Sequence, residues 1–136
     1  MSDNFSILVA DAEPILRNQL VRILESEGYN VTSVSTVVEL HEQSKAAKFN
    51  LLLLDLRITG LSSIEVLREL RANFPELAIV VLIAANEAFM LKEALKNGAD
   101  EYIIKPYKCH EVSLIIKRTY WRLLSIKETG KAFAKT

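Results

Sequence analysis

The stretch that decides the fold is Leu51-Leu52-Leu53-Leu54-Asp55, four leucines in a row closed by an acidic residue. Leucine by itself favours a helix. Here the abrupt end at Asp55, and the alternation of short apolar runs with helical patterns along the chain, favour a strand. An apolar run without polar alternation is typical of a parallel strand that helices cover on both faces. We therefore predict a central parallel strand over residues 51–54, with Asp55 at its carboxyl end.

Working outward from this strand, apolar runs and helical patterns alternate five times. Apolar residues recur at helical spacing between residues 16 and 24, 37 and 47, 64 and 70, 91 and 95, and 112 and 123. The other expected strands are residues 5–10, 30–35, 79–83 and 102–104. Five such β-α units predict an α/β fold, a doubly wound five-stranded parallel sheet in the order 2-1-3-4-5 with helices on both faces.

The length of 136 residues fits one domain. Half of the residues are apolar, which is enough for a packed core and too many for a disordered chain. We expect residues 1–124 to form the domain. Residues 125–136 are polar and lose the apolar periodicity after Leu124, so we expect a polar tail, a frayed helix end or the start of a linker there.

The composition argues against several functions. Lys and Arg number 17, as do Asp and Glu, so the basic surplus of a nucleic-acid-binding protein is missing and no direct nucleic-acid contact is expected. Cys109 is the single cysteine, which rules out an internal disulfide and makes a zinc cluster unexpected. The apolar runs are short for a membrane span, and the polar start Met1-Ser2-Asp3-Asn4 does not resemble a secretion signal. We expect a cytoplasmic protein without a membrane segment.

Three charged residues stand where predicted strands end, namely Asp11, Asp55 and Lys105. Any one of them alone would most simply be a solvated loop residue. Because parallel strands end at the same edge of a sheet, and the first and third strands are neighbours, the two carboxylates can converge there. Carboxylate oxygens suit Mg²⁺, and an ammonium group suits a phosphoryl oxygen. A carboxylate held between such cations is a plausible nucleophile for phosphoryl transfer.

Three segments of the chain resemble the receiver domains of bacterial two-component response regulators. They are residues 7–14 (ILVADAEP), 52–57 (LLLDLR) and 97–107 (NGADEYIIKPY), and the resemblance covers roughly residues 5–124. It implies a flavodoxin-like fold and a phosphoryl group accepted from a histidine kinase or phosphotransfer protein. Such a domain is not an enzyme beyond phosphorylation and dephosphorylation of its own aspartate.

The resemblance also implies a role for each residue of the site. Asp55 would be the phosphoacceptor, and Lys105 would contact the phosphoryl group. Mg²⁺ would be held by Asp55, by the backbone carbonyl of Arg57, and by Asp11 through a bound water. The family usually has a cis peptide bond at the position of Lys105-Pro106.

The chain departs from the family at two positions that matter for activation. Ala12 stands where the second acidic residue binds Mg²⁺, and Glu13 does not replace it. Ile83 stands at the switch position, where a Thr or Ser hydroxyl follows the phosphoryl group, and isoleucine has no hydroxyl and a stiff first torsion. We expect weak Mg²⁺ binding and impaired switching, hence an atypical receiver. Thr59 and Ser63, where proline and glycine are common, are tolerable departures.

Partner contacts are expected on the face formed by the fourth helix, the fifth strand and the last helix, through which a homodimer or an effector would bind. Tyr102 matches the rotating aromatic residue of the family, with Ile83 partly filling its inward route. Phe89, Met90 and Tyr120 are further candidate contacts, although packing in the core would also explain them. Trp121 is equally ambiguous, and His41 and His110 are assigned to the solvated surface.

Three other functions are alternatives to a phosphorylated receiver. A pseudo-receiver would act as a protein-interaction module without phosphorylation. A haloacid dehalogenase-like phosphatase needs a second aspartate two residues after the first, where this chain has Arg57. A flavodoxin-like cofactor binder needs a phosphate-binding loop after the first strand, where Asp11-Ala12-Glu13-Pro14 is acidic and would repel phosphate.

Overall fold

The structure is a computed structural model, which describes the backbone of residues 5–58 and 63–134. Thr59 lies outside the described residues. The core of the molecule is a parallel sheet of five strands in the order β2-β1-β3-β4-β5, which confirms the predicted fold. The strands are β1 (Ser6–Ala10), β2 (Asn30–Val34), β3 (Leu51–Asp55), β4 (Ala78–Ala84) and β5 (Glu101–Lys105).

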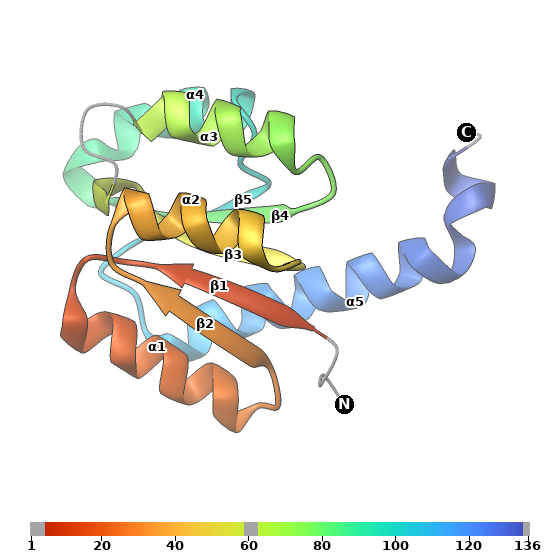
Figure 1. The fold of residues 1–136 in the computed structure, drawn as a ribbon, viewed down its shortest axis with the longest axis horizontal. Coiled ribbons are helices and arrows are strands. Elements are labelled where there is room, and N and C mark those ends of the chain that lie inside the picture. Colours follow the sequence, from red (N-terminus) through yellow and green to blue (C-terminus); the bar gives the residue numbers. More distant parts are fainter. Residues whose placement is uncertain (1–4, 59–62, 135–136) are drawn as a thin grey trace.

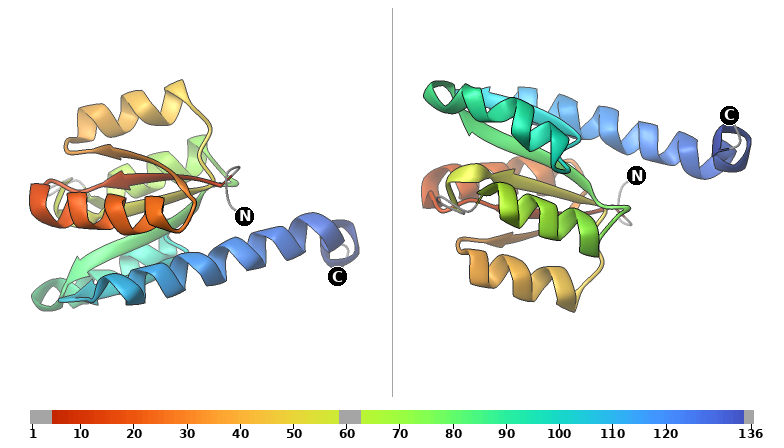
Figure 2. Two further views of the ribbon diagram at one scale, coloured as in Figure 1. Left: turned by 90° about the horizontal axis from the view of Figure 1, so that it is seen from below. Right: turned by 90° about the horizontal axis from the view of Figure 1, so that it is seen from above.

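Helices cover both faces of the sheet (Figures 1 and 2). One face packs against α1 and α5, and the other against α2, α3 and α4. A 3₁₀ helix, η2, follows β4 directly and leads into the short α4. The helices are α1 (Pro14–Ser26), α2 (Val37–Ala46), α3 (Ser63–Asn73), η2 (Ala85–Met90), α4 (Leu91–Lys96) and α5 (Cys109–Ala134).

The position of β3 between two layers of helices explains its unbroken run of leucines. Leu52 and Leu54 belong to the apolar cluster under α2, α3 and α4, whereas Leu51 and Leu53 belong to the cluster under α1 and α5. All four leucines are fully buried. A strand enclosed on both faces has no place for a polar side chain, which is why the run shows no alternation.

The last helix is longer than its apolar pattern. The periodicity of the sequence stops at Leu124, whereas α5 continues to Ala134 and projects beyond the amino edge of the sheet (Figure 1). Apolar periodicity reports the side of a helix that packs against a core, so it ends where packing ends, although the backbone can remain helical. Within the described part of the chain, no helix has the length and apolar character that a membrane span requires.

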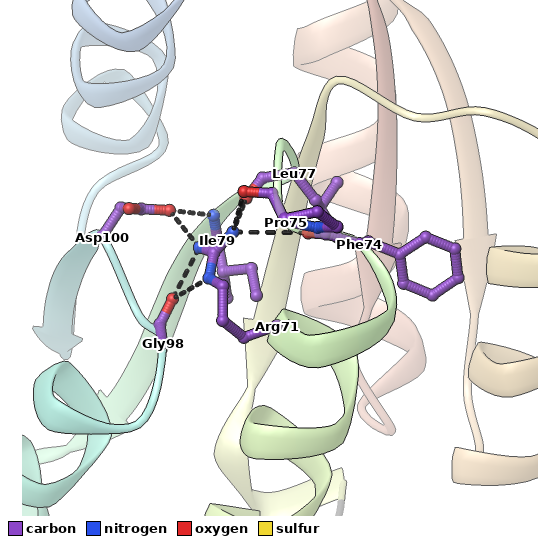
Figure 3. A network of polar contacts seen from close by, with 7 residues as sticks. All are labelled: Arg71, Phe74, Pro75, Leu77, Ile79, Gly98 and Asp100. Carbon is purple, nitrogen blue, oxygen red and sulfur yellow. Dashed lines mark hydrogen bonds and ion pairs between the residues drawn. The ribbon is translucent and has the colours of Figure 1, made fainter.

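A polar network centred on Arg71 joins the amino ends of β4 and β5 to the end of α3 (Figure 3). Its guanidinium donates to the carbonyl oxygens of Leu77 at 2.6 Å and Gly98 at 2.7 Å, and to Asp100 Oδ2 at 2.7 Å. Asp100 Oδ2 also accepts from the backbone N–H of Ile79 at 2.8 Å. Two longer bonds reach the carbonyls of Phe74 and Pro75. We call this set of contacts the Arg71 clasp.

The backbone conformation of Gly98 and its close contact with Arg71 both require a residue without a side chain. Its φ is +126°, a conformation that side chains rarely allow, and a Cβ there would lie 2.7 Å from Cβ of Arg71. The glycine therefore lets the loop between α4 and β5 approach α3 closely enough for the clasp to form.

Candidate functional site

The carboxyl edge of the sheet brings together the three charged residues expected there. Asp11 directly follows β1, Asp55 ends β3, and Lys105 ends β5. Lys105 Nζ donates a hydrogen bond to Asp55 Oδ2 and forms an ion pair with it. The Asp11 carboxyl lies close enough to both groups that their charges act on its titration. The arrangement is a pair of carboxyl groups with one ammonium group beside them.

Asp55 is held in place from two sides. Its side chain is 3% exposed; Oδ1 accepts from the backbone N–H of Arg57 at 2.9 Å, and Oδ2 accepts from Lys105. The Lys105–Pro106 peptide bond that precedes α5 is cis. A buried carboxylate with fixed donors has a defined orientation, which is what an in-line attack on phosphorus requires.

Asp11 is fully buried, and only one of its two carboxylate oxygens has a hydrogen-bond partner among the described residues. Its Oδ1 accepts from the backbone N–H of Glu13 at 2.9 Å, while Oδ2 has no hydrogen-bond partner among the described residues. Burial raises the pKa of Asp11, and the nearby charge of Asp55 raises it further, against the opposing effects of the Glu13 amide and Lys105. Arg17 donates to the backbone carbonyl of Asp11 at 2.9 Å and so fixes this loop.

Tyr107 is a further polar residue near the site that the sequence pattern did not single out. Its ring packs against the apolar cluster under α1 and α5, and its hydroxyl is buried without a hydrogen-bond partner in the described part of the chain. Burial raises the pKa of Tyr107, and the negative charge of Asp11 adds to the effect. Its place directly after Lys105-Pro106 was the available signal.

The donor set around Asp11 fits Mg²⁺. The cation prefers oxygen ligands and keeps several waters, so two carboxylates and a backbone carbonyl at Arg57 would suffice for weak binding. The orphaned Asp11 Oδ2 is a buried oxygen that a cation or a metal-bound water would satisfy. Ala12 is exposed and supplies no ligand, and no cluster of three or more acidic, His or Cys side chains gathers among the described residues.

The two residues predicted as switch positions, Ile83 and Tyr102, lie on the face of the sheet that α3 and α4 cover. Ile83 is buried in the apolar cluster there. Tyr102 pairs in register with Val81, on the neighbouring strand, and its side chain is 40% exposed. The interior on this face is thus filled by the isoleucine, and the tyrosine points outward.

The remaining candidate contacts separate into exposed and packed residues. Phe89 is 80% exposed and Trp121 is 52% exposed. Met90 packs against the core, and Tyr120 stacks edge-on with Phe5 at a centroid distance of 4.7 Å. His110 is exposed, and His41 lies near the surface with Nδ1 3.7 Å from a carboxylate oxygen of Glu69.

Comparison with known proteins agrees with this geometry. The family model of the response regulator receiver domain matches residues 7–117, so the chain belongs to that family. It is 34% identical over 114 residues to the alkaline phosphatase synthesis transcriptional regulatory protein PhoP of Bacillus subtilis, covering 84% of this chain and 48% of that protein. It is 34% identical over 104 residues to the transcriptional regulatory protein ZraR of Escherichia coli, covering 76% of this chain and 24% of that one.

Among solved structures, a response regulator receiver domain protein from Clostridium thermocellum has a TM-score of 0.79 at 26% identity, covering 90% of this chain and 98% of that one. This chain is therefore the receiver domain of a two-component response regulator. Receiver domains interact with histidine kinases or phosphotransfer proteins, generally bind Mg²⁺ at the phosphorylation site, and are generally not enzymes. The chain spans less than half the length of both curated relatives.

Replacing Asp11 by asparagine should raise the free energy of unfolding at pH 7 by about 1–3 kcal/mol, because a neutral amide costs less to bury beside Asp55 than a carboxylate does. The amide keeps the acceptor for Glu13 N–H and removes the charge beside Asp55. Because the folded-state pKa of Asp11 is raised, its favourable contribution is complete below the unfolded value near 3.8 and is lost as pH rises through the folded value. The gain from Asp11→Asn should therefore grow with pH above about 4.

Urea unfolding of both proteins without Mg²⁺ between pH 4 and pH 8 measures this gain. Glu13→Gln removes the same charge from an exposed neighbour and should leave stability unchanged within about 0.5 kcal/mol. A parent and an Asp11→Asn variant with parallel pH curves would contradict the prediction.

Proposed function

We propose that this receiver accepts a phosphoryl group on Asp55 from a histidine kinase or a phosphotransfer protein. The observation that supports the proposal is the buried Asp55 carboxylate, oriented by the Arg57 amide and paired with Lys105. One carboxylate oxygen attacks phosphorus while the bond to the donor breaks, and the product is an acyl phosphate. Lys105 then neutralises charge on the phosphoryl oxygens.

Mg²⁺ would be held by Asp11, Asp55 and the backbone carbonyl of Arg57. When bound, the cation supplies positive charge to the transferring phosphoryl oxygens. With Ala12 in place of a carboxylate, the negative field that attracts the cation is smaller and one ligand position falls to water. We therefore propose that Mg²⁺ binds weakly and that phosphorylation is slow.

Ile83 supports a second part of the proposal, that phosphorylation changes the shape of the domain less than usual. It offers no side-chain donor to a phosphoryl oxygen. A charge-assisted hydrogen bond of that kind is typically worth about 1.5–3 kcal/mol. A switch whose two states differ by a few kcal/mol loses most of its bias without it.

The face formed by α4, β5 and α5 is proposed as the contact surface for a second copy or an effector domain. Because α4 has six residues, it leaves the outward side chains of β5 partly uncovered. The large apolar side chains that are exposed on these elements and on η2 include Phe89, Leu95, Tyr102, Ile104, Leu114 and Trp121. Residues 1–124 are proposed as the receiver proper, and residues 125–136 as a polar tail or the start of a linker.

A pseudo-receiver that works by binding alone is the second candidate, favoured by the absence of an acid at position 12 and a hydroxyl at position 83. One experiment separates the two. The protein is incubated with acetyl phosphate and Mg²⁺ and analysed by mass spectrometry. The proposal expects one added phosphoryl group in the parent and in Glu13→Gln, and none in Asp55→Asn. A parent that stays unmodified overturns the proposal in favour of the pseudo-receiver.

A further inference from the structure

Arg57 contacts the proposed phosphoacceptor and the η2 helix at the same time. Its backbone N–H donates to Asp55 Oδ1 at 2.9 Å, and its guanidinium Nε lies 3.4 Å from Glu87 Oε1 in η2. The residue thus connects the end of β3 to the segment that follows β4. Its side chain is 58% exposed and that of Glu87 is 35% exposed, so neither group is held by burial.

The η2 segment is weakly held at this end. All six of its residues are described and none is buried. Hydrogen bonds of a 3₁₀ helix have poorer geometry than those of an α-helix. The far end of α4, by contrast, is tied to α3, because Arg68 Nε donates to Asn97 Oδ1 at 3.1 Å and the Arg71 clasp holds Gly98. The η2–α4 unit is therefore anchored at its far end and packed against the core through Met90, and the Glu87 carboxylate restrains its near end.

Charge decides which partner Arg57 prefers once Asp55 is phosphorylated. A phosphoryl group carries a charge of about −1.5 to −2 with three acceptor oxygens, and a guanidinium can bind two of them in parallel. Glu87 offers a single charge at 3.4 Å in an exposed position, where ion pairs contribute little. The new acceptor lies on Asp55, to which the Arg57 backbone is already hydrogen-bonded.

We propose that Arg57 contacts the phosphoryl group on Asp55 and, in doing so, releases Glu87 and loosens η2. The inference rests on the proposed function of Asp55. No covalent bond to Arg57 forms or breaks, and the guanidinium stays protonated throughout. The phosphoryl group replaces Glu87 as its hydrogen-bonded partner. This exchange provides a coupling that the apolar side chain of Ile83 does not provide.

The test uses beryllofluoride with Mg²⁺ as a phosphoryl mimic. Amide hydrogen exchange of residues 85–90 is measured with and without it, and fluorine NMR measures its binding. Mimic binding to the parent should raise exchange in η2 by about two- to fivefold, the range of an exposed ion pair. Without the mimic, Arg57→Gln and Glu87→Gln should both raise exchange to a similar level.

The two variants should change the affinity for the mimic in opposite directions. Glu87→Gln frees the guanidinium, so binding should tighten by the same factor as η2 loosens, because coupling between two sites is reciprocal. Arg57→Gln removes the contact, so binding should weaken. A merely structural role for the pair would loosen η2 in both variants without this split. Arg118→Gln is the matched control, since Arg118 is 60% exposed and pairs with Glu101 on β5.

Four outcomes are decisive. Mimic binding to the parent without faster exchange in η2 overturns the inference, and so does a shift of affinity in the same direction in both variants. Failure of the parent to bind the mimic, with no phosphorylation of Asp55, overturns the proposed function and the inference together. Opposite shifts of affinity with an unchanged Arg118→Gln variant support it.

Discussion

Replacement of Arg71 by methionine is expected to lower the free energy of unfolding by about 3 kcal/mol. Methionine keeps much of the apolar stem but leaves the carbonyl oxygens of Leu77 and Gly98 without their strongest donor. It also removes the ion pair with Asp100, whose carboxylate would retain the Ile79 amide. Because the Arg71 side chain is only 26% exposed, water replaces these contacts incompletely.

Urea unfolding at neutral pH measures the change, and Arg68→Met is the matched control. Arg68 lies on the same helix three residues earlier, is exposed, and donates a hydrogen bond to Asn97 Oδ1. Its loss should cost less than about 1 kcal/mol. Equal losses for the two variants would show that the Arg71 clasp contributes no more than an exposed arginine.

Restoring both missing activation groups, with Ala12→Asp and Ile83→Thr together, should give a strong phosphorylation-driven change. Ala12 is exposed beside Asp11, so a carboxylate fits there, adds a ligand for Mg²⁺ and should speed phosphorylation of Asp55 roughly tenfold or more. The threonine adds a donor for a phosphoryl oxygen and frees space on the face that Tyr102 shares. The first change acts on chemistry and the second on coupling, so neither should suffice alone.

Ile83→Thr should cost roughly 1–3 kcal/mol of stability, because a hydroxyl replaces packed apolar atoms in a buried position. The measurement is amide exchange across α4 and β5, with and without beryllofluoride, in the parent, both single variants and the double variant. The largest response is expected in the double variant. A parent that responds as strongly would refute the claim that Ala12 and Ile83 limit the switch.

The sequence predicted the sheet and the three charges at its edge because both depend on local patterns. The leucine run of residues 51–54 has no polar alternation, and Asp11, Asp55 and Lys105 follow apolar runs, so topology alone brings them to one edge. Which groups then touch one another depends on side-chain packing. That Lys105 pairs with Asp55, while one oxygen of Asp11 stays unpaired, could not be predicted from spacing.

The contacts that sequence reasoning missed join residues far apart in the chain. Arg71 looks like an ordinary exposed arginine on a helix, but two of its partners, Gly98 and Asp100, lie 27 and 29 residues later in the chain. The Arg57–Glu87 pair spans 30 residues and depends on where η2 ends up after β4. The position of Tyr120 on α5 does not reveal whether it faces solvent, but the ring of Phe5, which directly precedes β1, packs against it. No local periodicity carries such information.

The long α5 amplifies small movements of its packed part at its far end. Its packed part is tied to the end of α1 through Ser113, whose hydroxyl donates to Glu27 at 2.7 Å, and Thr119 is the last fully buried residue among the side chains of α5 that the structure describes. From there the helix continues to Ala134, and its last turns bend away from the direction of its packed part (Figure 1). A small tilt of the packed part would therefore move the far end further than it moves the packed part itself. A displacement too small to disturb the core thus becomes a larger one at the far end of α5.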